Sequence, residues 1–413
     1  MVDGQRLWRS LMDLARIGAT EKGGNCRLAL TSLDGQGRDL VVGWMKETGL
    51  TITVDQVGNI FGRRPGRRDD MPPVVTGSHI DTQPTGGKFD GCYGVMAGLE
   101  VMRTLRDRGI ETEAPLELAI WTNEEGSRFV PVMMGSGVFA RKFPLETALE
   151  ARDAAGISVR SELQAIGYAG SAPVGGRPLS AYFEAHIEQG PILENEDKVI
   201  GVVTGSLGLR WYDLTVIGME AHAGPTPMAL RRDALFAATY LMQEVIHIAN
   251  AHQPHGRGTV GVVRVHPGSR NVIPGAVTFS VDLRHQDEAE LAAMDARLRA
   301  ACLDAERSSN VKVQLKDVQY FEPTSFDAAL VGMVRQHARA SGLPAMDIVS
   351  GAGHDAVYIA AVAPTAMIFV PCKDGISHNE IEDAKLEHLE AGCNVLLASI
   401  LQAAAGARTG VTG

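Results

Sequence analysis

The sequence contains little cysteine, and its few cysteines are poorly placed for pairing. Only five of the 413 residues are cysteine, an odd number, and they are widely separated along the chain. They are Cys26, Cys92, Cys302, Cys372 and Cys393. This distribution fits neither the disulfide framework of a small secreted protein nor a CxxC metal-binding pair. We therefore expect a reducing compartment and a cytoplasmic protein.

Basic residues are not in excess either. Lys and Arg total 39 against 49 Asp and Glu, which gives a formal net charge of −10. Proteins that bind the phosphate backbone carry a basic surface instead. We therefore expect no nucleic-acid partner.

Long hydrophobic runs are absent as well. The longest apolar run, Tyr358 to Cys372, is interrupted by Pro364 and falls short of the roughly 20 residues that cross a bilayer. Near the N-terminus, Leu7, Leu11, Leu14 and Ile17 have the spacing of one helix face and do not form the apolar block of a signal peptide. We therefore expect no association with a membrane.

What the sequence does contain is typical of a globular protein of several units. Hydrophobic residues make up 45% and charged residues 21% of the chain, close to the usual averages. A length of 413 residues suits two or three domains of roughly 100 to 200 residues. Glycine is the one outlier, with 46 residues, which indicates many tight turns or backbone that approaches a ligand.

The order of expected strands and helices predicts an α/β protein with an insertion. Strands and helices alternate up to about Trp211 and again after Pro323, whereas the intervening segment has the order of a split βαβ, or ferredoxin-like, motif. We expect one discontinuous domain, residues 1–211 and 324–413, and an inserted domain, residues 212–323. The expected strands are 73–77, 116–121, 211–217, 259–265, 276–284, 311–320, 346–349 and 365–370, and the main helices 93–108, 231–252, 288–308, 326–341, 355–360 and 384–405.

Polar residues follow the first of these strands in the segment VVTGSHIDTQPTGGKFDG. It places His79, Asp81 and Asp90 in a glycine-rich loop, where an open α/β sheet usually presents its ligands. Since His79 and Asp81 are two residues apart, we expect Asp81 to hold one imidazole nitrogen while the other binds a metal. Without further context, such a pair is more often an ordinary surface or core contact.

The strand in LELAIWTNEEGSRF ends in paired carboxylates, Glu124 and Glu125. Adjacent side chains cannot readily point in one direction, so one acid is a candidate cation ligand. The other is a candidate general base, with its pKa raised by burial and by the neighbouring carboxylate. The spacing alone does not say which is which, and a solvated Glu pair is the alternative.

Two more strands end in histidines. His186 lies in AYFEAHIEQG, and His378 follows the strand of MIFVPCKDGISHNE. Each is weak alone. Together with His79, Asp90 and the Glu pair they form an oxygen and nitrogen donor set that suits two divalent cations bridged by a carboxylate.

The chain resembles the hydantoinase/carbamoylase branch of the M20 metallopeptidase family, which includes N-carbamoyl-L-amino-acid hydrolases, β-ureidopropionases and allantoate amidohydrolases. The resemblance extends from about Asp55 to Glu380. It implies a Zn-exopeptidase-like catalytic domain and an inserted lid and dimerisation domain. The motifs that carry it are, in order, GSHIDT, GGKFDG, NEEGSRF, HIEQG, HAGPTPM, RNVIPG, DLRH, GAGHDA and GISHNE.

The resemblance also implies roles for the residues of the site. It makes Asp90 the bridging ligand, Glu125 a ligand and Glu124 the catalytic base. His186 favours an amidase, because the exopeptidase branch generally has an acid at this position. The remaining implied metal ligands are His79, His186 and His378, and the ions are Zn most readily, with Mn, Co or Ni as alternatives.

Further residues match substrate contacts of that family, namely Gln189, His222, Asn271 and Arg284. Arg284 offers a bidentate fork for a carboxylate, and His222 can stabilise a developing oxyanion. The alternatives are a surface ion pair for Arg284 and local turn chemistry for His222.

The motif GAGHDA leaves two interpretations open. Gly351 and Gly353 could let the backbone approach the substrate, or Asp355 could cap the following helix. No role for His354 follows from the sequence.

The expected activity is metal-dependent hydrolysis of the ureido C–N bond of an N-carbamoyl amino acid to the amino acid, ammonia and carbon dioxide. An allantoate amidohydrolase or β-ureidopropionase of the same branch is the alternative, followed by an M20 metalloexopeptidase or aminoacylase. We also expect a homodimer formed through the inserted domain.

Overall fold

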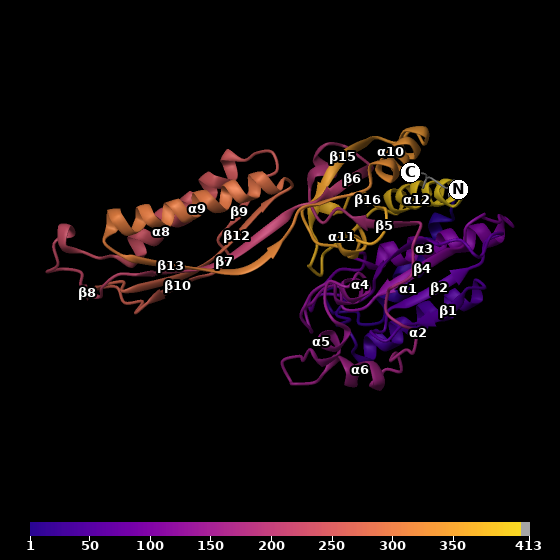
Figure 1. Cartoon of the computed structure of the whole chain (residues 1–413), viewed down its shortest axis with the longest axis horizontal. Helices are drawn as coiled ribbons and strands as arrows, with labels where there is room; N and C mark the ends of the chain where they lie inside the picture. Colours follow the sequence, from indigo (N-terminus) through magenta and orange to yellow (C-terminus); the bar gives the residue numbers. More distant parts are fainter. Residues whose placement is uncertain (406–413) are drawn as a thin grey trace. The chain divides into compact units, whose positions relative to one another are not determined.

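The computed structural model describes residues 1–405, which form two compact units (Figure 1). One comprises Met1–Thr204 and the described chain from Phe326 onward, and the other comprises Gly205–Ser325. Each unit has its own cluster of buried apolar side chains, as separately packed domains do. The limits 212 and 323 expected from the sequence lie a few residues inside the second unit.

The nine-stranded mixed sheet of the larger unit has the order β1-β2-β4-β3-β5-β16-β6-β14, in which β15 also pairs with β6, and only its β14 and the end of β6 fall within Gly205–Ser325. Its strands are β1 Thr51–Val54, β2 Ile60–Arg64, β3 Val74–His79, β4 Leu116–Trp121, β5 Ala181–Ile187, β6 Ile200–Ser206, β14 Thr324–Ser325, β15 Ala345–Ser350 and β16 Thr365–Val370. Its helices are α1 Gly4–Ala15, α2 Ser32–Glu47, α3 Cys92–Asp107, α4 Met134–Phe139, α5 Leu145–Glu150, α6 Val159–Ala165, α7 Ile192–Asn195, α10 Ala328–Ala340, α11 Asp355–Ile359 and α12 Leu386–Ala405, with a 3-10 turn η2 at Lys373–Gly375.

Four neighbouring strands in the centre of this sheet run parallel. β3 pairs in parallel with β4 and β5, and β5 pairs in parallel with β16. All four are buried along their whole length, as expected for strands covered on both faces. Because parallel strands end at the same edge, the residues that follow β3, β4, β5 and β16 are brought together.

Helices fix the loop after β3 in place. α3 begins at Cys92, directly after the loop residues Asp90 and Gly91, and packs on β3. α1 and α12 in turn pack against α3. The apolar spacing of Leu7, Leu11 and Leu14 correctly predicts α1, since all three are buried. Ile17, expected on the same face, lies two residues past the end of the helix and is half-buried.

The smaller unit has the predicted strand–helix–strand–strand–helix–strand order. Its antiparallel sheet has the order β10-β12-β7-β13, with β9 also paired to β12, as in a ferredoxin-like fold. The alternating burial of β12 shows that one face of the sheet is covered, and α8 and α9 pack on it. Its elements are β7 Gly208–Ile217, β8 Ala221–His222, η1 Met228–Leu230, α8 Ala234–Ala251, β9 Arg257–Thr259, β10 Val263–His266, β11 Val272–Ile273, β12 Ala276–His285, α9 Glu288–Ser309 and β13 Lys312–Phe321.

The single strand predicted for residues 259–265 is wrong, because it is split into β9 and β10. Thr259 pairs with Asp282 and Val263 pairs with Phe279, so three residues on one side oppose two on the other. This extra residue is a β-bulge, which interrupts the ladder. Periodicity alone did not reveal it.

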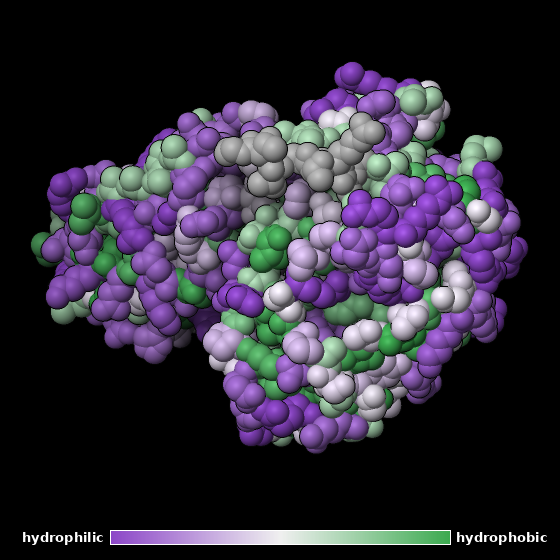
Figure 2. Space-filling model, turned by 45° about the vertical axis from the view of Figure 1, so that its right-hand side comes forward, coloured by the Kyte–Doolittle hydropathy of each residue, from purple (hydrophilic) through white to green (hydrophobic). Residues whose placement is uncertain are grey.

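The molecular surface is largely hydrophilic on the face shown in Figure 2, with small separate apolar patches. Among the described residues, no helix is both long enough and apolar enough to cross a membrane.

Candidate metal centre

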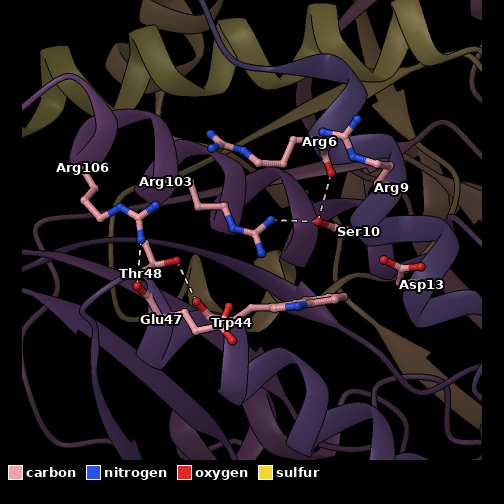
Figure 3. Close-up of a pocket in the computed structure, with 9 residues that line it drawn as sticks. All are labelled: Arg6, Arg9, Ser10, Asp13, Trp44, Glu47, Thr48, Arg103 and Arg106. Carbon is pink, nitrogen blue, oxygen red and sulfur yellow. Dashed lines mark hydrogen bonds between the residues drawn. The ribbon is translucent and has the colours of Figure 1, made fainter.

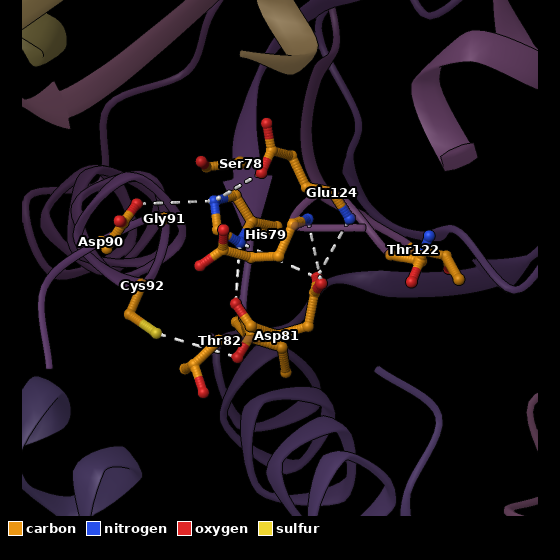
Figure 4. A network of polar contacts seen from close by, with 12 residues as sticks. Ser78, His79, Asp81, Thr82, Asp90, Gly91, Cys92, Thr122 and Glu124 are labelled. Carbon is orange, nitrogen blue, oxygen red and sulfur yellow. Dashed lines mark hydrogen bonds and ion pairs between the residues drawn. The ribbon is translucent and has the colours of Figure 1, made fainter. Parts of the chain in front are cut away.

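The parallel strand ends bring together residues that are far apart in the sequence. His79 is the last residue of β3 and lies in register with Trp121, the last residue of β4. His186 lies near the end of β5, in register with Phe369 of β16. Glu124 follows β4, and Figure 4 shows His79 between Glu124, Asp81 and Asp90.

The carboxylate of Asp90 lies between two groups of candidate ligands. Its Oδ1 is 3.3 Å from His186 Nε2 and 3.8 Å from His79 Nε2. Its Oδ2 is 3.2 Å from His378 Nε2, which is itself 3.4 Å from Glu125 Oε2. Asp90 therefore belongs to two three-residue groups that could each hold a metal ion, His79–Asp90–His186 and Asp90–Glu125–His378.

Backbone carbonyls orient the two buried imidazoles. His79 Nδ1 lies 2.9 Å from the carbonyl oxygen of Asp81, and His186 Nδ1 lies 2.9 Å from that of Ile187. A carbonyl only accepts, so Nδ1 carries the proton in each ring. In the neutral form of each ring the lone pair is then on Nε2, the nitrogen that faces Asp90. In His186 this nitrogen also accepts a hydrogen bond of 3.0 Å from the Gly91 N–H.

Asp81 orients His79 through its backbone carbonyl oxygen and not, as expected, through its carboxylate. Its carboxylate lies 3.8 Å from the imidazole and instead accepts hydrogen bonds from the backbone N–H groups of Glu124 and Glu125, at 3.3 and 3.2 Å. Asp81 therefore connects the β3 loop to the β4 loop and fixes the backbone that carries the paired glutamates.

The two glutamates lie in different surroundings. Glu125 belongs to the group with Asp90 and His378, and Gln83 Nε2 donates a hydrogen bond of 2.7 Å to its Oε2. Glu124 belongs to neither of the two Asp90-containing groups, and its Oε2 lies 3.5 Å from His79 Nε2. Burial raises the pKa of Glu124 well above its usual value, and the carboxylates of Asp355 and Glu125 raise it further.

The electrostatics of the site favour bound cations. Burial also raises the pKa of Glu125, with Asp90 adding to the effect. Burial would raise the pKa of Asp90 too, but His186 and His378 hold it well below its usual value. Burial would lower the pKa of His186, but Asp90 raises it to about 9. Positive charge beside Asp90 is therefore strongly favoured, and the oxygen and nitrogen donor set fits divalent ions.

Unusual backbone conformations occur at the site. Asn123, Gln189 and His378 have φ angles of 53°, 59° and 54°, in the left-handed region that non-glycine residues rarely adopt. Gly91 has φ 63°, and a Cβ there would lie 2.3 Å from the His79 ring. The backbone is thus constrained where it presents these side chains.

A third group of possible ligands, Glu184, His186 and His354, shares His186 with the first group. The Glu184 oxygens already accept hydrogen bonds from Ser78 Oγ and the Ala356 N–H. His354 Nε2 lies 3.0 Å from Ser350 Oγ, and its ring meets that of His186 edge-on at 4.5 Å. Since both Glu184 oxygens and His354 Nε2 already have hydrogen-bond partners, we interpret this group as support for His186.

Residues 75–402 match the model of peptidase family M20/M25/M40. This chain belongs to that family. Enzymes of the family use divalent metals, in agreement with the two groups that share Asp90.

Relatives of the chain match it over nearly their whole length. It is 48% identical over 403 residues to an N-carbamoyl-L-amino-acid amidohydrolase of Rhizobium meliloti, covering 98% of this chain and 97% of that protein. An allantoate amidohydrolase of Bacillus subtilis is 35% identical, with 93% of each chain covered. The crystal structure of a hydantoinase/carbamoylase family amidase from Burkholderia multivorans is 60% identical, covers 98% of each chain and has a TM-score of 0.96. This M20 family member is therefore a hydrolase of the hydantoinase/carbamoylase branch.

Of the expected substrate contacts in this M20 hydrolase, Gln189 lies at the candidate metal centre. Its Nε2 donates a hydrogen bond of 2.8 Å to Asp90 Oδ2. Gly353 is exposed and directly precedes the buried His354. Asp355 does not cap α11 but accepts a hydrogen bond from Ser136 Oγ.

The expected contacts in the smaller unit lie at two separate places. His222 pairs in register with Val272, next to Asn271, and its Nδ1 accepts a hydrogen bond from the Gly224 N–H. Arg284 lies near the far end of β12, where Asp282 accepts hydrogen bonds from its Nε and Nη2. The ion pair and the turn contact considered from the sequence are therefore both present.

The sequence interpretation missed Glu382, a buried acid next to the bridging carboxylate. Its Oε1 accepts hydrogen bonds from the N–H groups of Phe89 and Asp90, at 2.9 and 3.1 Å. Its Oε2 accepts a 3.0 Å hydrogen bond from Ser377 Oγ. A Cβ atom at Gly87 would clash with the carboxyl group of Glu382. Glu382 thus holds the backbone of Asp90 in place. Its position four residues after His378 was the available signal.

We expect Glu382→Ala to weaken metal binding by about 10- to 100-fold, because loss of a group that orients a ligand has that effect. Glu382→Gln should lose less, because an amide oxygen still accepts both backbone hydrogen bonds. Chelator competition measures the affinity. The control is Glu387→Ala at an exposed position of α12, and equal affinity for both alanine variants would contradict the role of Glu382.

Proposed function

We propose that this M20 hydrolase cleaves the ureido C–N bond of N-carbamoyl amino acids to give the amino acid, ammonia and carbon dioxide. The observation that carries the proposal is the Asp90 carboxylate, which offers one oxygen to each of two ligand groups. The name of the 48% identical relative supports the substrate class.

His79, Asp90 and His186 would hold one divalent ion, and Asp90, Glu125 and His378 the other. When bound, such ions polarise the carbonyl to be attacked and make water a better nucleophile. Zinc suits this mixture of imidazole and carboxylate ligands, and manganese, cobalt and nickel are the alternatives.

Glu124 would be the general base. It lies outside the two Asp90-containing groups but beside His79, at 3.5 Å. Its raised pKa brings it closer to the range in which a carboxylate can both take and return a proton. It would take a proton from the attacking water and pass it to the leaving nitrogen, while Gln189 contacts the substrate.

A second substrate is supported by a specific relative. The 35% identical allantoate amidohydrolase makes allantoate, another ureido acid, the second candidate. N-carbamoyl-β-alanine follows as the substrate of a β-ureidopropionase, and a dipeptide or acylated amino acid is the more distant alternative. The five free cysteines support a reducing compartment such as the cytoplasm.

We further propose that the smaller unit is a lid and dimerisation domain. Arg284 lies eight residues along β12 from Ala276, the end nearest to His222 and Asn271, which is about 27 Å at 3.4 Å per residue. One small substrate cannot touch both places on one copy. A site that uses both would draw them from two subunits. All four residues of the edge strand β10 are exposed, which leaves an edge for pairing.

The first test separates the two glutamates. Glu124→Gln should keep its metal but lose turnover by about 100- to 10,000-fold, because a base is removed and no ligand. Glu125→Gln should lose metal. Metal analysis and ammonia release measure the two properties. If Glu124→Gln loses metal and Glu125→Gln keeps both metal and activity, the roles are reversed.

The second test concerns the substrate carboxylate. Arg284→Ala should lower kcat/KM for N-carbamoyl amino acids about 100-fold, because a charge-assisted bidentate contact is lost. The corresponding N-carbamoyl amino-acid amides, which lack the carboxylate, should be little affected. Ammonia release measures both series.

The matched control is Arg257→Ala, because Arg257 lies opposite Arg284 in the β9–β12 ladder. An equal loss on the amides would contradict the contact with the carboxylate. Faster cleavage of dipeptides than of any ureido acid by the parent enzyme would overturn the proposed reaction.

The third test concerns the two-subunit site. His222→Ala and Glu124→Gln should each be nearly inactive. In a mixed dimer with one copy of each variant, one of the two sites combines the intact Glu124 of one subunit with the intact His222 of the other. Random pairing makes about half of the dimers mixed, so about a quarter of all sites should be active. Co-expression followed by an activity assay measures this. A fully active monomer in sedimentation experiments, or mixed dimers without restored activity, would contradict the shared site.

A further inference from the structure

A cavity of about 260 Å³ lies among α1, α2 and α3 of the larger unit and is rich in arginine (Figure 3). α1 and α3 provide its arginines, and α2 with the following residue provides its opposite wall. Its lining residues are Arg6, Arg9, Ser10, Asp13, Trp44, Glu47, Thr48, Arg103 and Arg106.

Two of the four arginines are neutralised by carboxylates. Arg6 forms ion pairs of 2.7 Å with Glu100 and 2.6 Å with Asp107. Arg106 is 3.0 Å from Asp107 and donates a hydrogen bond to the carbonyl oxygen of Glu47. These two guanidinium groups are therefore part of the wall and are not available to a ligand.

Arg103 differs from them. It is half-buried, and its Nη1 donates a 2.8 Å hydrogen bond to Ser10 Oγ, a neutral group. Figure 3 shows its guanidinium between Ser10 and the ring of Trp44, and its Cζ lies 5.5 Å from the ring centroid. Within residues 1–405 it forms no ion pair with a carboxylate. Burial lowers its pKa, although nearby Glu100 counteracts this, as expected for a charge with too little compensation.

The remaining charges of the lining sum to a small positive value. Arg9 is exposed and forms no side-chain hydrogen bond or ion pair with the part of the chain that the structure describes. Asp13 is 3.3 Å from Arg16 outside the lining, which leaves Glu47 as the one acid of the lining without an ion pair among the described residues. Arg9 and Arg103 against Glu47 leave one uncompensated positive charge.

We propose that this cavity binds a small organic carboxylate. The planar guanidinium of Arg103 offers a two-pronged donor for a carboxylate, and Arg9 adds a second positive charge at the exposed side. Trp44 provides an apolar wall for the rest of the ligand. A single uncompensated charge matches a monoanion better than a doubly charged phosphate.

The cavity is separate from the candidate metal centre. Arg103 lies eleven residues beyond Cys92 on α3, which is about 17 Å along the helix axis. The two places nevertheless share structural elements. α3 begins directly after the loop that carries Asp90, and Trp8 of α1 contacts Phe89, with ring centroids 5.7 Å apart. The proposal does not depend on the reaction catalysed.

Calorimetric titration of the full-length metal-loaded enzyme with benzoate tests the proposal. Benzamide has the same shape without the charge and should not bind. Arg103→Gln should weaken benzoate binding at least tenfold, and Arg9→Gln should weaken it less. Arg9 is exposed, so that variant keeps the test valid if Arg103→Gln is unstable. Arg339→Gln, at an exposed position of α10, removes the same charge elsewhere and should bind benzoate like the parent.

Carboxylates can also bind at a metal centre, and such binding would persist in Arg103→Gln and Arg9→Gln. Benzoate binding of parental strength in both variants would therefore overturn the proposal, as would equal binding of benzamide. Binding that both variants weaken and Arg339→Gln retains would support it.

Discussion

The site depends on one carboxylate that faces two ligand groups. Asp90 directs one oxygen toward His79 and His186 and the other toward His378. Its position is fixed from three sides, by α3 immediately after it and by hydrogen bonds from Gln189 and Ser377 to its Oδ2, while Glu382 holds its backbone N–H. A bridging ligand needs this degree of constraint, since a small displacement would alter both ligand groups together.

The buried acids around Asp90 also need hydrogen-bond donors to hold them in place. Buried carboxylates without compensation are unstable, and three acids near Asp90, namely Asp81, Glu184 and Glu382, are held by N–H or O–H donors. Asp81 accepts from two backbone N–H groups, and Glu184 accepts from Ser78 and Ala356. These hydrogen bonds hold the carboxylates and the loops that carry them in one defined arrangement.

Much of the fold could be predicted from the sequence, because its signals are local. β4 was predicted at its observed limits, residues 116–121, since a run of buried apolar residues marks a strand covered on both faces. The bulge between β9 and β10 could not be predicted, because it depends on pairing with β12. The candidate ligands were recognisable because each follows a strand. Glu382 was missed because it acts through the backbone N–H groups of Phe89 and Asp90, and its position four residues after His378 does not by itself report such a contact.

The smaller unit poses a different problem, because its candidate residues are recognisable in the sequence but lie at two separate places. His222 lies in β8, which pairs with β11 shortly before β12 begins, whereas Arg284 lies near the other end of β12. A ten-residue antiparallel strand is stiff, and β7 pairs with all ten residues of β12. Because the strand is stiff, it cannot bend enough to bring these two side chains together. A rigid movement of the whole unit leaves the distance between them unchanged. Under the proposal that one substrate uses both places, a second copy would supply one of them. If both are used, dimer formation is a condition of catalysis and not merely a means of covering an exposed sheet edge.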